Sequence, residues 1–356
     1  MKICRLSTFL DFGGIESKMV NLSKWKDKNE WLYVALGKGG NAEERIKKSD
    51  ARAIALHLPV AIPSLRTIFN LYRFLRKEKP DVLHTSGAEA NFFGFLAGKL
   101  AGVPKIIVEE IGIPNHSRKA KAIFGFIFRY ADYTVGESEA VVRYITKQFN
   151  LSPQKTTVVY NFGVFNYDFS KVSVNKIKDT FDILMVSRLE PVKNIEGVLN
   201  VLSGLKKETK CKVKLIIAGT GSSENSLKKM VYDLDLEDSV EFVGFINDPY
   251  PYLLNSDLFI LNSFSEGFSN SLVESMYSNT LSLSTAVGAA PEIIEDGVNG
   301  FLVPPNDEHA LFEKIESIIK LTKEKRKEIG EAGHKTVVEN FSLKKHVSEL
   351  MKLYQN

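Results

Sequence analysis

The sequence predicts an α/β protein built from two doubly wound parallel sheets, and three observations lead to this fold class. The chain has 356 residues, which is more than one hydrophobic core usually serves. Its first half alternates short apolar runs with helical stretches, and its second half repeats this alternation. Apolar runs separated by helices are typical of parallel sheets. We therefore expect two domains of similar architecture.

The first half opens with an apolar strand that carries the charge of Arg5 and leads to the glycine pair Gly13-Gly14. A helix is expected to follow over residues 15–22. Further strands are expected over residues 31–36, 81–84 and 105–108, and further helices over 64–79 and 89–101. In an open parallel sheet, ligands bind at the carboxyl ends of the strands. The turns that follow these strands are therefore the first places to look for a site.

The second half repeats the same order. Strands are expected over residues 181–186, 213–218 and 240–244, again in alternation with helices. The stretch 161–179 is polar and has no clear period, so the connection between the domains is placed there. We expect an N-terminal domain over residues 1–165, a linker over 166–179, a C-terminal domain over 180–340 and a capped helix over 341–356.

Composition and charge exclude several classes of protein. Contents of 44% hydrophobic and 25% charged residues are those of a folded soluble protein. Cys4 and Cys211 are too few for a disulfide framework or a cysteine metal site, and no apolar span is long enough to cross a bilayer. We expect a cytoplasmic protein. Residues 1–170 hold 25 Lys and Arg against 16 Asp and Glu, a net charge of +9, whereas the remainder carries −5. The two halves therefore have different electrostatic partners.

Two carboxylates bracket an expected helix start in the second half. Gly267 permits a tight turn, and Ser269 or Asn270 can cap the helix that follows. The free N–H groups and the dipole of a helix start favour a phosphate. A carboxylate cannot stabilise a phosphate, so Glu266 and Glu274 are expected to accept hydrogen bonds from sugar hydroxyls.

Two cations follow the first strand of the second half. Arg188 and Lys193 lie on one loop, and an arginine fork with a lysine suits a diphosphate, although loop cations are also often simply solvated. A further glycine turn, Gly219-x-Gly221, follows the next strand. Gly13-Gly14 either lets a ligand approach the backbone or forms a plain turn. No Gly-x-Gly-x-x-Gly fingerprint is present, which argues against a nicotinamide enzyme.

Taken in order, these motifs carry a family resemblance. The chain resembles the retaining glycosyltransferases of family 4 with the GT-B fold through Gly13-Gly14, Ser187-x-Leu-x-x-x-Lys193, Gly219-x-Gly221, Glu266-Gly-Phe-x-x-x-x-x-Glu274 and Gly288-x-x-Pro-Glu292. The resemblance implies two Rossmann-like domains facing across a cleft, with the final helix packing back on the N-terminal domain. It also implies a nucleotide-sugar donor, commonly a UDP-sugar, on the C-terminal domain and a glycan or lipid-linked acceptor on the N-terminal domain.

The resemblance also assigns roles to matching residues. Arg188 and Lys193 would bind the diphosphate, Glu266 the transferred sugar and Glu274 the ribose. The leaving diphosphate would help deprotonate the acceptor hydroxyl, so no protein nucleophile is expected. The two cations and the helix start would supply the charge that a metal ion supplies elsewhere, so the resemblance implies neither a metal ion nor a separate cofactor. The residues expected to be catalytic are Glu266, Arg188, Lys193 and His84. Those expected to hold the donor are Gly13, Gly14, Ser187, Arg188, Lys193, Gly219, Gly221, Phe245, Ile246, Glu266, Gly267, Phe268, Ser269, Asn270 and Glu274.

One departure from the family concerns the acceptor side. Ser86 stands where many relatives carry a second histidine two places after His84. His84 either reaches the cleft or packs at the strand end. Glu109 and Glu110, expected after the strand over 105–108, either meet acceptor hydroxyls or form salt bridges. Ser138 resembles a strand-end serine of the family, and its role stays open.

Two basic segments in the first half indicate a membrane partner. The segment from Ser64 to Lys79 and the segment Arg118–Tyr130 interleave cations with aromatic and aliphatic residues. Basic amphipathic helices lie on anionic headgroups, although the same pattern also fits ordinary helices with a core-facing side. Together with the charge of the first half, the pattern favours peripheral attachment to the cytoplasmic face of a membrane. The basic residues form no recognised nucleic-acid-binding module.

Three functions are compatible with the sequence. The first is a glycosyltransferase of cell-surface polysaccharide or lipopolysaccharide synthesis. The second is a nucleotide-sugar 2-epimerase on the same fold, for which only His84, Glu109 and Glu110 offer acid or base groups. The third is a non-catalytic nucleotide-sugar-binding protein, against which the intact Arg188 and Lys193 argue.

Overall fold

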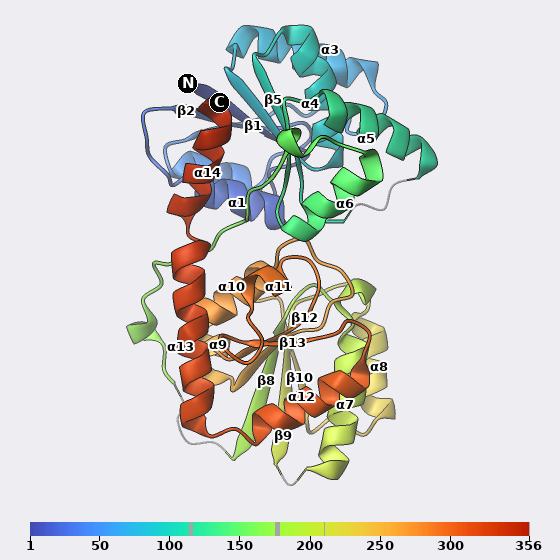
Figure 1. Ribbon diagram of the computed structural model, residues 1–356, viewed down its shortest axis with the longest axis vertical. Helices are drawn as coiled ribbons and strands as arrows, with labels where there is room; N and C mark the ends of the chain where they lie inside the picture. The colour runs from blue at the N-terminus through green and yellow to red at the C-terminus, as the bar shows by residue number, and fades with distance from the viewer. Residues whose placement is uncertain (114–116, 175–178, 210, 356) are drawn as a thin grey trace. The chain divides into compact units, whose positions relative to one another are not determined.

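The computed structural model describes residues 1–113, 117–174, 179–209 and 211–355. The chain divides into two compact units, each with its own hydrophobic core (Figure 1). Unit 1 comprises Met1–Phe162 and Leu343–Asn356, and unit 2 comprises Gly163–Ser342. The expected linker over 166–179 therefore starts inside unit 2, where Phe169–Lys171 form the short helix η2.

Unit 1 contains, within the described residues, a parallel sheet of seven strands in the order β3-β2-β1-β4-β5-β6-β7. The strands are β1 Lys2–Ser7, β2 Glu30–Ala35, β3 Arg52–Ala55, β4 Val82–Ser86, β5 Lys105–Glu110, β6 Tyr133–Gly136 and β7 Thr156–Val158. Every residue of β4 is buried, as expected for a strand covered on both faces. Because β4 and β5 are longer than the sequence indicated, Ser86, Glu109 and Glu110 lie in strands rather than after them.

Helices cover both faces of this sheet. Figure 1 shows α3, α4, α5 and α6 on one side and α1 with the C-terminal helix on the other. The helices before the chain leaves unit 1 are α1 Gly14–Leu22, α2 Asn41–Lys48, α3 Leu65–Glu78, α4 Ala88–Ala101, α5 Arg118–Tyr130, α6 Glu139–Phe149 and the short η1 Pro153–Lys155.

The C-terminal helix α14, Leu343–Gln355, completes unit 1. It buries Val347, Leu350 and Tyr354, and the Tyr354 ring lies 6.2 Å from that of Trp31 on β2. The expectation that the final helix packs on the N-terminal domain is therefore confirmed.

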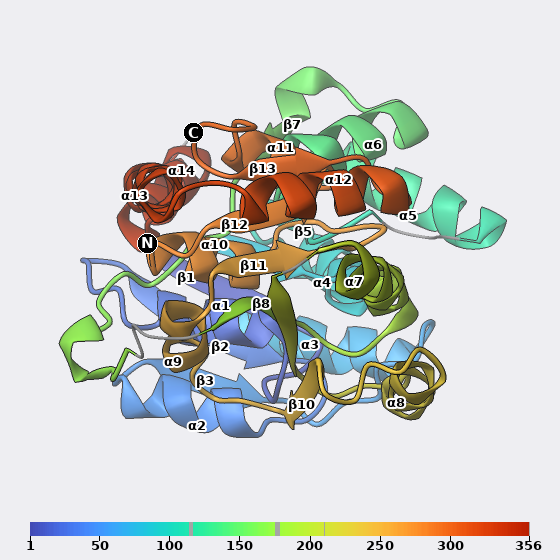
Figure 2. The same cartoon turned by 90° about the horizontal axis from the view of Figure 1, so that it is seen from below.

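Unit 2 contains, again within the described residues, a parallel sheet of six strands in the order β10-β9-β8-β11-β12-β13. The strands are β8 Thr180–Val186, β9 Lys212–Ala218, β10 Val240–Gly244, β11 Leu258–Leu261, β12 Ser282–Thr285 and β13 Phe301–Val303. Figure 2 shows α7, α8 and α12 on one side of this sheet and α9, α10 and α13 on the other. The helices are η3 Pro191–Lys193, α7 Ile195–Glu208, α8 Glu224–Asp233, α9 Tyr250–Asn255, α10 Asn270–Tyr277, α11 Ala290–Ile293, α12 Glu308–Ile319 and α13 Lys323–Asn340.

Serine side chains fix several helix starts. The hydroxyls of Ser64, Ser117, Ser138 and Ser269 accept hydrogen bonds from backbone N–H groups in the first turns of α3, α5, α6 and α10. Such a cap contributes about 1 kcal/mol to helix stability. Ser138, whose role the sequence left open, is thus the cap of α6.

Candidate functional site

The loops after β8, β9 and β10 are tied together at the carboxyl edge of the second sheet. The Ser187 N–H donates to the carbonyl of Ala218 at 3.0 Å, and the Gly219 N–H donates to the carbonyl of Gly244 at 2.8 Å. Gly219 has a φ of +142°, and a Cβ there would lie 1.8 Å from the Ser187 carbonyl oxygen. Only glycine allows this approach. The packing holds the loop that carries Arg188 at the edge of the sheet.

Arg188 and Lys193 have different surroundings. Arg188 is exposed, and its guanidinium donates no hydrogen bond to any described residue. Lys193 is mostly buried, with its Nζ 2.5 Å from Oε1 of Glu266, and the Ser263 hydroxyl donates to the same oxygen at 2.6 Å. An ammonium has three N–H donors, so Lys193 keeps donors for a ligand. Lys193 and Glu266, which the sequence assigned to different parts of a donor, form one ion pair here.

Contacts between two loops hold this ion pair in place. The Phe264 N–H donates to the carbonyl of Val192 at 2.8 Å, and the Asn262 amide donates to the carbonyl of Asn194 at 3.0 Å. Asn194 has a positive φ of 47° and caps α7. The loop after β11 is therefore fastened to the loop after β8, and Glu266 stays within reach of Lys193.

The start of α10 is built as the sequence indicated. Ser269 caps it by accepting from the Leu272 N–H at 3.3 Å, so Ser269 rather than Asn270 is the cap. Gly288 has a φ of +55°, and a Cβ there would lie 2.4 Å from the Glu266 carbonyl oxygen. The turn before α11 thus packs tightly against the turn before α10. This packing fixes the direction of the N–H groups at the helix start, which favour an anion.

Glu274 lies one turn into α10 and is partly exposed. Burial, with a further contribution from the negative charge of Asp248, raises the pKa of Glu274 to about 7. No described residue donates a hydrogen bond to its carboxyl group. A carboxylate that is partly removed from water and lacks a donor is costly, so it is suited to a ligand that brings hydroxyl groups.

The loop after β10 presents an aromatic side chain. Phe245 is 67% exposed and follows Gly244, which has a φ of +71°. Further along the loop, the Asp248 carboxylate accepts from the Tyr167 hydroxyl at 2.6 Å and from the Tyr250 N–H at 3.1 Å. Phe245 is therefore an open apolar surface on a loop that is tethered a few residues later.

In unit 1, the glycine pair opens α1. Gly13 is its N-cap with a φ of +152° and supplies no side-chain cap. No atom would lie within 4 Å of a Cβ on Gly14. The backbone at the start of α1 is therefore accessible, and contact of Gly13 and Gly14 with donor phosphates stays a prediction.

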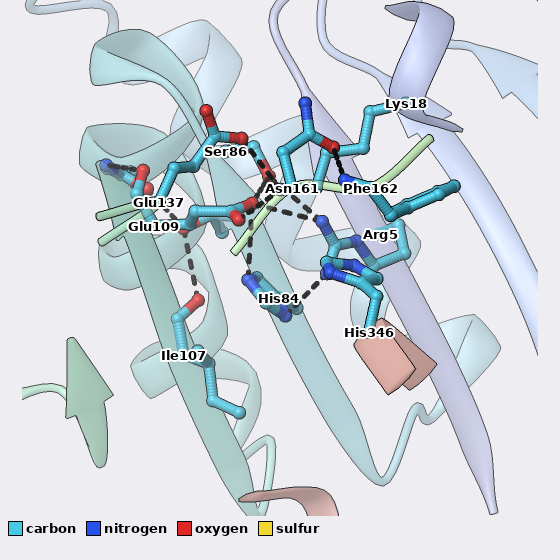
Figure 3. Close-up of polar contacts among 12 residues, drawn as sticks. Arg5, Lys18, His84, Ser86, Ile107, Glu109, Glu137, Asn161, Phe162 and His346 are labelled. Atoms are coloured by element: carbon cyan, nitrogen blue, oxygen red, sulfur yellow. Dashed lines mark hydrogen bonds and ion pairs between the residues drawn. The ribbon is translucent and has the colours of Figure 1, made fainter. Parts of the chain in front are cut away.

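Unit 1 also contains a buried set of charges, which we call the charge network: Arg5, Lys18, His84, Glu109 and Glu137 (Figure 3). The Glu109 carboxylate is at its centre. Its Oε2 lies 3.1 Å from Arg5 Nη2, and its Oε1 lies 2.6 Å from Lys18 Nζ, which is also 2.8 Å from Glu137 Oε1. Buried charges are stable only when they are paired in this way. Glu109 thus forms salt bridges, one of the two alternatives that the sequence left open.

His84 is fully buried inside the network. Its Nδ1 lies 2.6 Å from Arg5 Nη1 and 2.7 Å from the Tyr354 hydroxyl. Because a guanidinium only donates, Nδ1 accepts, and the ring proton belongs on Nε2, 3.5 Å from Glu109 Oε2. Burial and the charge of Arg5 lower the pKa of His84 to about 3, so the ring is neutral at physiological pH. The structure favours the packed alternative for His84, and its geometry gives no support to the expected catalytic role.

Comparison with protein families decides the class of this protein. Residues 12–162 match the family model described as Glycosyltransferase Family 4, and residues 166–336 match the model described as Glycosyl transferases group 1. The chain belongs to these glycosyltransferases. The two matched ranges correspond to the N-terminal part of unit 1 and to most of unit 2.

Two relatives of this glycosyltransferase are named for undecaprenol-linked sugars. It is 26% identical over 239 residues to the N-acetylgalactosamine-N,N'-diacetylbacillosaminyl-diphospho-undecaprenol 4-alpha-N-acetylgalactosaminyltransferase of Campylobacter jejuni, over 64% of each chain. It is 24% identical over 316 residues to the UDP-Gal:alpha-D-GlcNAc-diphosphoundecaprenol alpha-1,3-galactosyltransferase of Escherichia coli, over 82% of this chain and 80% of that protein. The match with the Campylobacter relative thus spans less than two thirds of that protein's length.

Solved structures share the fold of this glycosyltransferase. Anabaena HepE in complex with UDP superposes with a TM-score of 0.86 at 20% identity, over 99% of both chains. The lipopolysaccharide outer core galactosyltransferase WaaB superposes with a TM-score of 0.76 at 20% identity, over 99% of both chains. The expected GT-B fold of two Rossmann-like domains is therefore confirmed.

The predicted donor residues of the glycosyltransferase divide between the units. Gly13 and Gly14 lie in unit 1, as does His84, which was predicted to be catalytic, and all the other predicted donor residues lie in unit 2. Those in unit 2 occupy the loops after β8, β9, β10 and β11 and the start of α10: Ser187, Arg188, Lys193, Gly219, Gly221, Phe245, Ile246, Glu266, Gly267, Phe268, Ser269, Asn270 and Glu274. Sequence reasoning missed Ser263 and Asp248, which have no motif of their own, and Lys18 and Glu137 of the charge network.

Over residues 1–113, 117–174, 179–209 and 211–355, no group of three or more His, Cys, Asp or Glu side chains is arranged to hold a metal ion. Over the same residues, no helix has both the length and the apolar character that a membrane span needs.

Proposed function

We propose that this glycosyltransferase moves a sugar from a UDP-sugar to a lipid-linked acceptor with retention of configuration and without a metal ion. One arrangement in unit 2 carries the proposal. At the carboxyl edge of its sheet, the loop after β8 holds Arg188 and Lys193, and the loop after β11 leads to the start of α10, the helix that contains the unpartnered carboxyl group of Glu274. These groups match a diphosphate and a ribose. The names of relatives that act on diphosphoundecaprenol-linked sugars, and UDP in HepE, support this choice of substrates.

In the proposed reaction, the bond between the anomeric carbon and the diphosphate oxygen breaks. A bond to the acceptor oxygen forms on the same face of the sugar, and the acceptor proton passes to the leaving diphosphate. Negative charge grows on the diphosphate during this step. The Arg188 guanidinium, the Lys193 ammonium and the N–H groups at the start of α10 are the groups that would stabilise it. They supply the positive charge that a metal ion would otherwise provide.

The carboxylates position the donor. Glu274 would accept hydrogen bonds from the ribose hydroxyls, because it has no protein donor of its own. Glu266 would bind hydroxyls of the transferred sugar while Lys193 neutralises its charge. Phe245 and Ile246 would lie against the base, where the exposed Phe245 ring offers an apolar surface.

The geometry gives little support to a 2-epimerase. That reaction needs acid and base groups at the sugar, and the sequence offered His84, Glu109 and Glu110. His84 is buried and neutral, and both Glu109 oxygens are bonded to protein groups. Glu110 alone is left, whereas the reaction needs both an acid and a base at the sugar.

A transfer assay tests the proposal. The full chain is incubated with GlcNAc-diphosphoundecaprenol in detergent and with UDP-galactose, UDP-glucose, UDP-GlcNAc or UDP-GalNAc. We expect UDP release that depends on the lipid, an unchanged rate in EDTA, and an α-linked product by NMR. No transfer from any of these donors would contradict the proposed substrates, and a β-linked product would contradict retention.

Arg188→Ala tests the assignment of the diphosphate site in the same assay. We expect turnover to fall by about 10²–10³-fold, the usual effect of losing one group that stabilises transition-state charge, with a smaller change in donor affinity. Lys229→Ala removes an exposed cation from α8 of the same unit and should leave turnover unchanged. Wild-type turnover in Arg188→Ala would remove this residue from the site.

We also propose that unit 1 attaches the enzyme to the cytoplasmic face of an anionic membrane. On α3, Leu71 and Leu75 are buried in the core, whereas Leu65 is 82% and Phe69 is 58% exposed. On α5, the exposed residues Ile123, Phe126 and Tyr130 follow a helical spacing and lie beside the cations Arg118, Lys119, Lys121 and Arg129. A core-facing side accounts for the buried residues only, so the exposed apolar residues support the membrane alternative.

Flotation tests this attachment. The protein should float with phosphatidylglycerol-containing vesicles at low salt, less at high salt, and not with pure phosphatidylcholine vesicles. Phe69→Ser combined with Phe126→Ser should reduce flotation, whereas Tyr232→Ser, at a residue 70% exposed in unit 2, should not. Equal absence from anionic and neutral vesicles would contradict the attachment.

A further inference from the structure

Glu109 and Glu110 are adjacent carboxyl groups at the carboxyl end of β5, and their surroundings are opposite. Successive side chains of a strand point to opposite faces of the sheet. Glu109 points into the charge network, where its Oε1 is bonded to Lys18 and its Oε2 to Arg5 and to the hydroxyl of Ser86 at 2.5 Å (Figure 3). Both of its oxygens are bonded to protein groups, and the side chain is fully buried. Because Glu109 is fully buried and bonded to protein groups through both oxygens, it is not exposed to a substrate.

Glu110 points to the side of the sheet that α4 covers. Its Oε1 accepts a hydrogen bond from the Asn91 amide at 3.2 Å. Asn91 is itself fixed, because its amide oxygen accepts from the Thr85 hydroxyl at 2.6 Å and its amide nitrogen also donates to the Glu109 carbonyl at 3.0 Å. No other side chain among the described residues bonds to the Glu110 carboxyl group. One oxygen is thus held in place, and the other has no bond to a described side chain.

The position of Glu110 is that of a ligand-binding residue. It is the last residue of β5, at the strand edge where ligands of open parallel sheets bind, and it keeps 5% of its surface exposed. The two residues that follow in this loop with large apolar side chains, Ile111 and Ile113, are 37% and 41% exposed. A carboxyl group at the base of an exposed apolar loop is suited to one directed hydrogen bond.

We propose that Glu110 binds the sugar acceptor as a neutral carboxylic acid that donates its proton in a hydrogen bond to an acceptor oxygen. The proposal rests on the proposed function and names the side chain of unit 1 that recognises the acceptor. A neutral acid can donate where a carboxylate can only accept. It also avoids the repulsion that a carboxylate would exert on the diphosphate of a lipid-linked sugar.

The charges around Glu110 support this protonation state. Burial, with a further contribution from the negative charge of Glu109, raises the pKa of Glu110 to about 8. Lys18 and Arg5 keep the pKa of Glu109 well below its usual range, so Glu109 stays ionised while Glu110 titrates. Glu137 directly follows the neighbouring strand β6; its N–H donates to the Glu110 carbonyl at 3.3 Å, and its carboxylate is paired with Lys18. No cation of the described residues pairs with Glu110.

Acceptor kinetics against pH test the proposal. With GlcNAc-diphosphoundecaprenol, the acceptor KM of the wild type should rise about tenfold one pH unit above the pKa of Glu110, because about one molecule in eleven is then protonated. Glu110→Gln keeps a neutral donor, so it should abolish this rise and keep a low KM. Glu110→Ala should raise the acceptor KM at every pH and leave the donor KM unchanged. A structural role would instead change both KM values and the melting temperature.

A matched control is Glu44→Gln, which neutralises an exposed carboxylate on α2 of the same unit and should follow the wild type. Wild-type pH dependence in Glu110→Gln would overturn the proposal. A second measurement needs no turnover: at neutral pH, the infrared absorption of protonated carboxyl groups should be weaker in Glu110→Gln than in the wild type, and the remaining absorption includes that of Glu274, whose pKa is raised to about 7. Equal absorption in the two proteins would also overturn the proposal. Failure of sugar transfer with every donor would contradict the proposed function instead. In that case the infrared measurement alone would test whether Glu110 is protonated.

Discussion

The hydroxyl of Tyr354 joins the C-terminal helix to the charge network, and Tyr354→Phe removes only this group. The hydroxyl accepts a hydrogen bond from Arg5 Nη1 at 3.1 Å and lies 2.7 Å from Nδ1 of His84, to which it donates. The aromatic ring and its packing near Trp31 remain in the variant. The change therefore separates the polar contribution of α14 from its apolar contribution.

The expected loss follows from these two bonds. The bond from Arg5 involves a charged donor, and such bonds are worth about 1.5–3 kcal/mol. The bond to His84 adds little, because Nδ1 still accepts from Arg5 Nη1 at 2.6 Å. We therefore expect Tyr354→Phe to lower the free energy of unfolding of unit 1 by about 1.5–3 kcal/mol.

Urea denaturation followed by tryptophan fluorescence measures this loss. Both tryptophans of the chain, Trp25 and Trp31, lie in unit 1, so their signal reports on that unit. Tyr232→Phe removes a hydroxyl from a side chain that is 70% exposed in unit 2 and should leave the transition unchanged. A loss below about 0.5 kcal/mol in Tyr354→Phe, the usual range of surface substitutions, would refute the reasoning.

Three further predictions concern unit 2. Glu274→Ala should weaken UDP binding by about 1.5–3 kcal/mol in calorimetry, whereas Glu237→Ala, at an exposed carboxylate, should not. Because the pKa of Glu274 is raised to about 7 and its ionised form accepts from hydroxyls, wild-type UDP binding should strengthen as pH rises through 7; a flat profile would contradict this. Gly219→Ala should destabilise unit 2 far more than Gly244→Ala, since both have positive φ but only the new Cβ at Gly219 would meet the Ser187 carbonyl. Equal melting temperatures of the Gly219→Ala and Gly244→Ala variants would contradict this prediction.

The fold was predictable because its signals are local. Apolar runs that alternate with helical stretches predict a parallel sheet. The cap at Ser269 depends only on residues within one turn of it in the sequence, so it could also be predicted. The ion pair of Lys193 with Glu266 was not predictable, because the two residues are 73 positions apart and meet only when their loops bond to each other. Sequence reasoning therefore placed both residues on the donor side but did not predict that they neutralise each other.

The charge network shows a second limit of sequence reasoning. Arg5 was visible as a charge inside an apolar strand, and such a charge needs a partner when the strand is buried. Its partners His84 and Glu109 come from two other strands, and only the register of β1, β4 and β5 aligns them on one face. The strand ends were also placed too early, so Glu109 and Glu110 were assigned to a loop. Their division into a paired and an unpaired carboxyl depends on which face each one points to.

The docking of α14 in unit 1 has a consequence for biosynthesis. The core strands of unit 1 emerge from the ribosome first. The hydrogen bonds of Arg5 and His84 with Tyr354 cannot form until Tyr354 is made, after the whole of unit 2. During translation, unit 2 is therefore the only one of the two units that has all its residues before the final helix appears. A nascent chain that stops short of α14 would expose the apolar surface beneath that helix and leave a buried guanidinium incompletely bonded. Chaperones and proteases recognise such features, so incomplete chains would be removed before they reach a substrate.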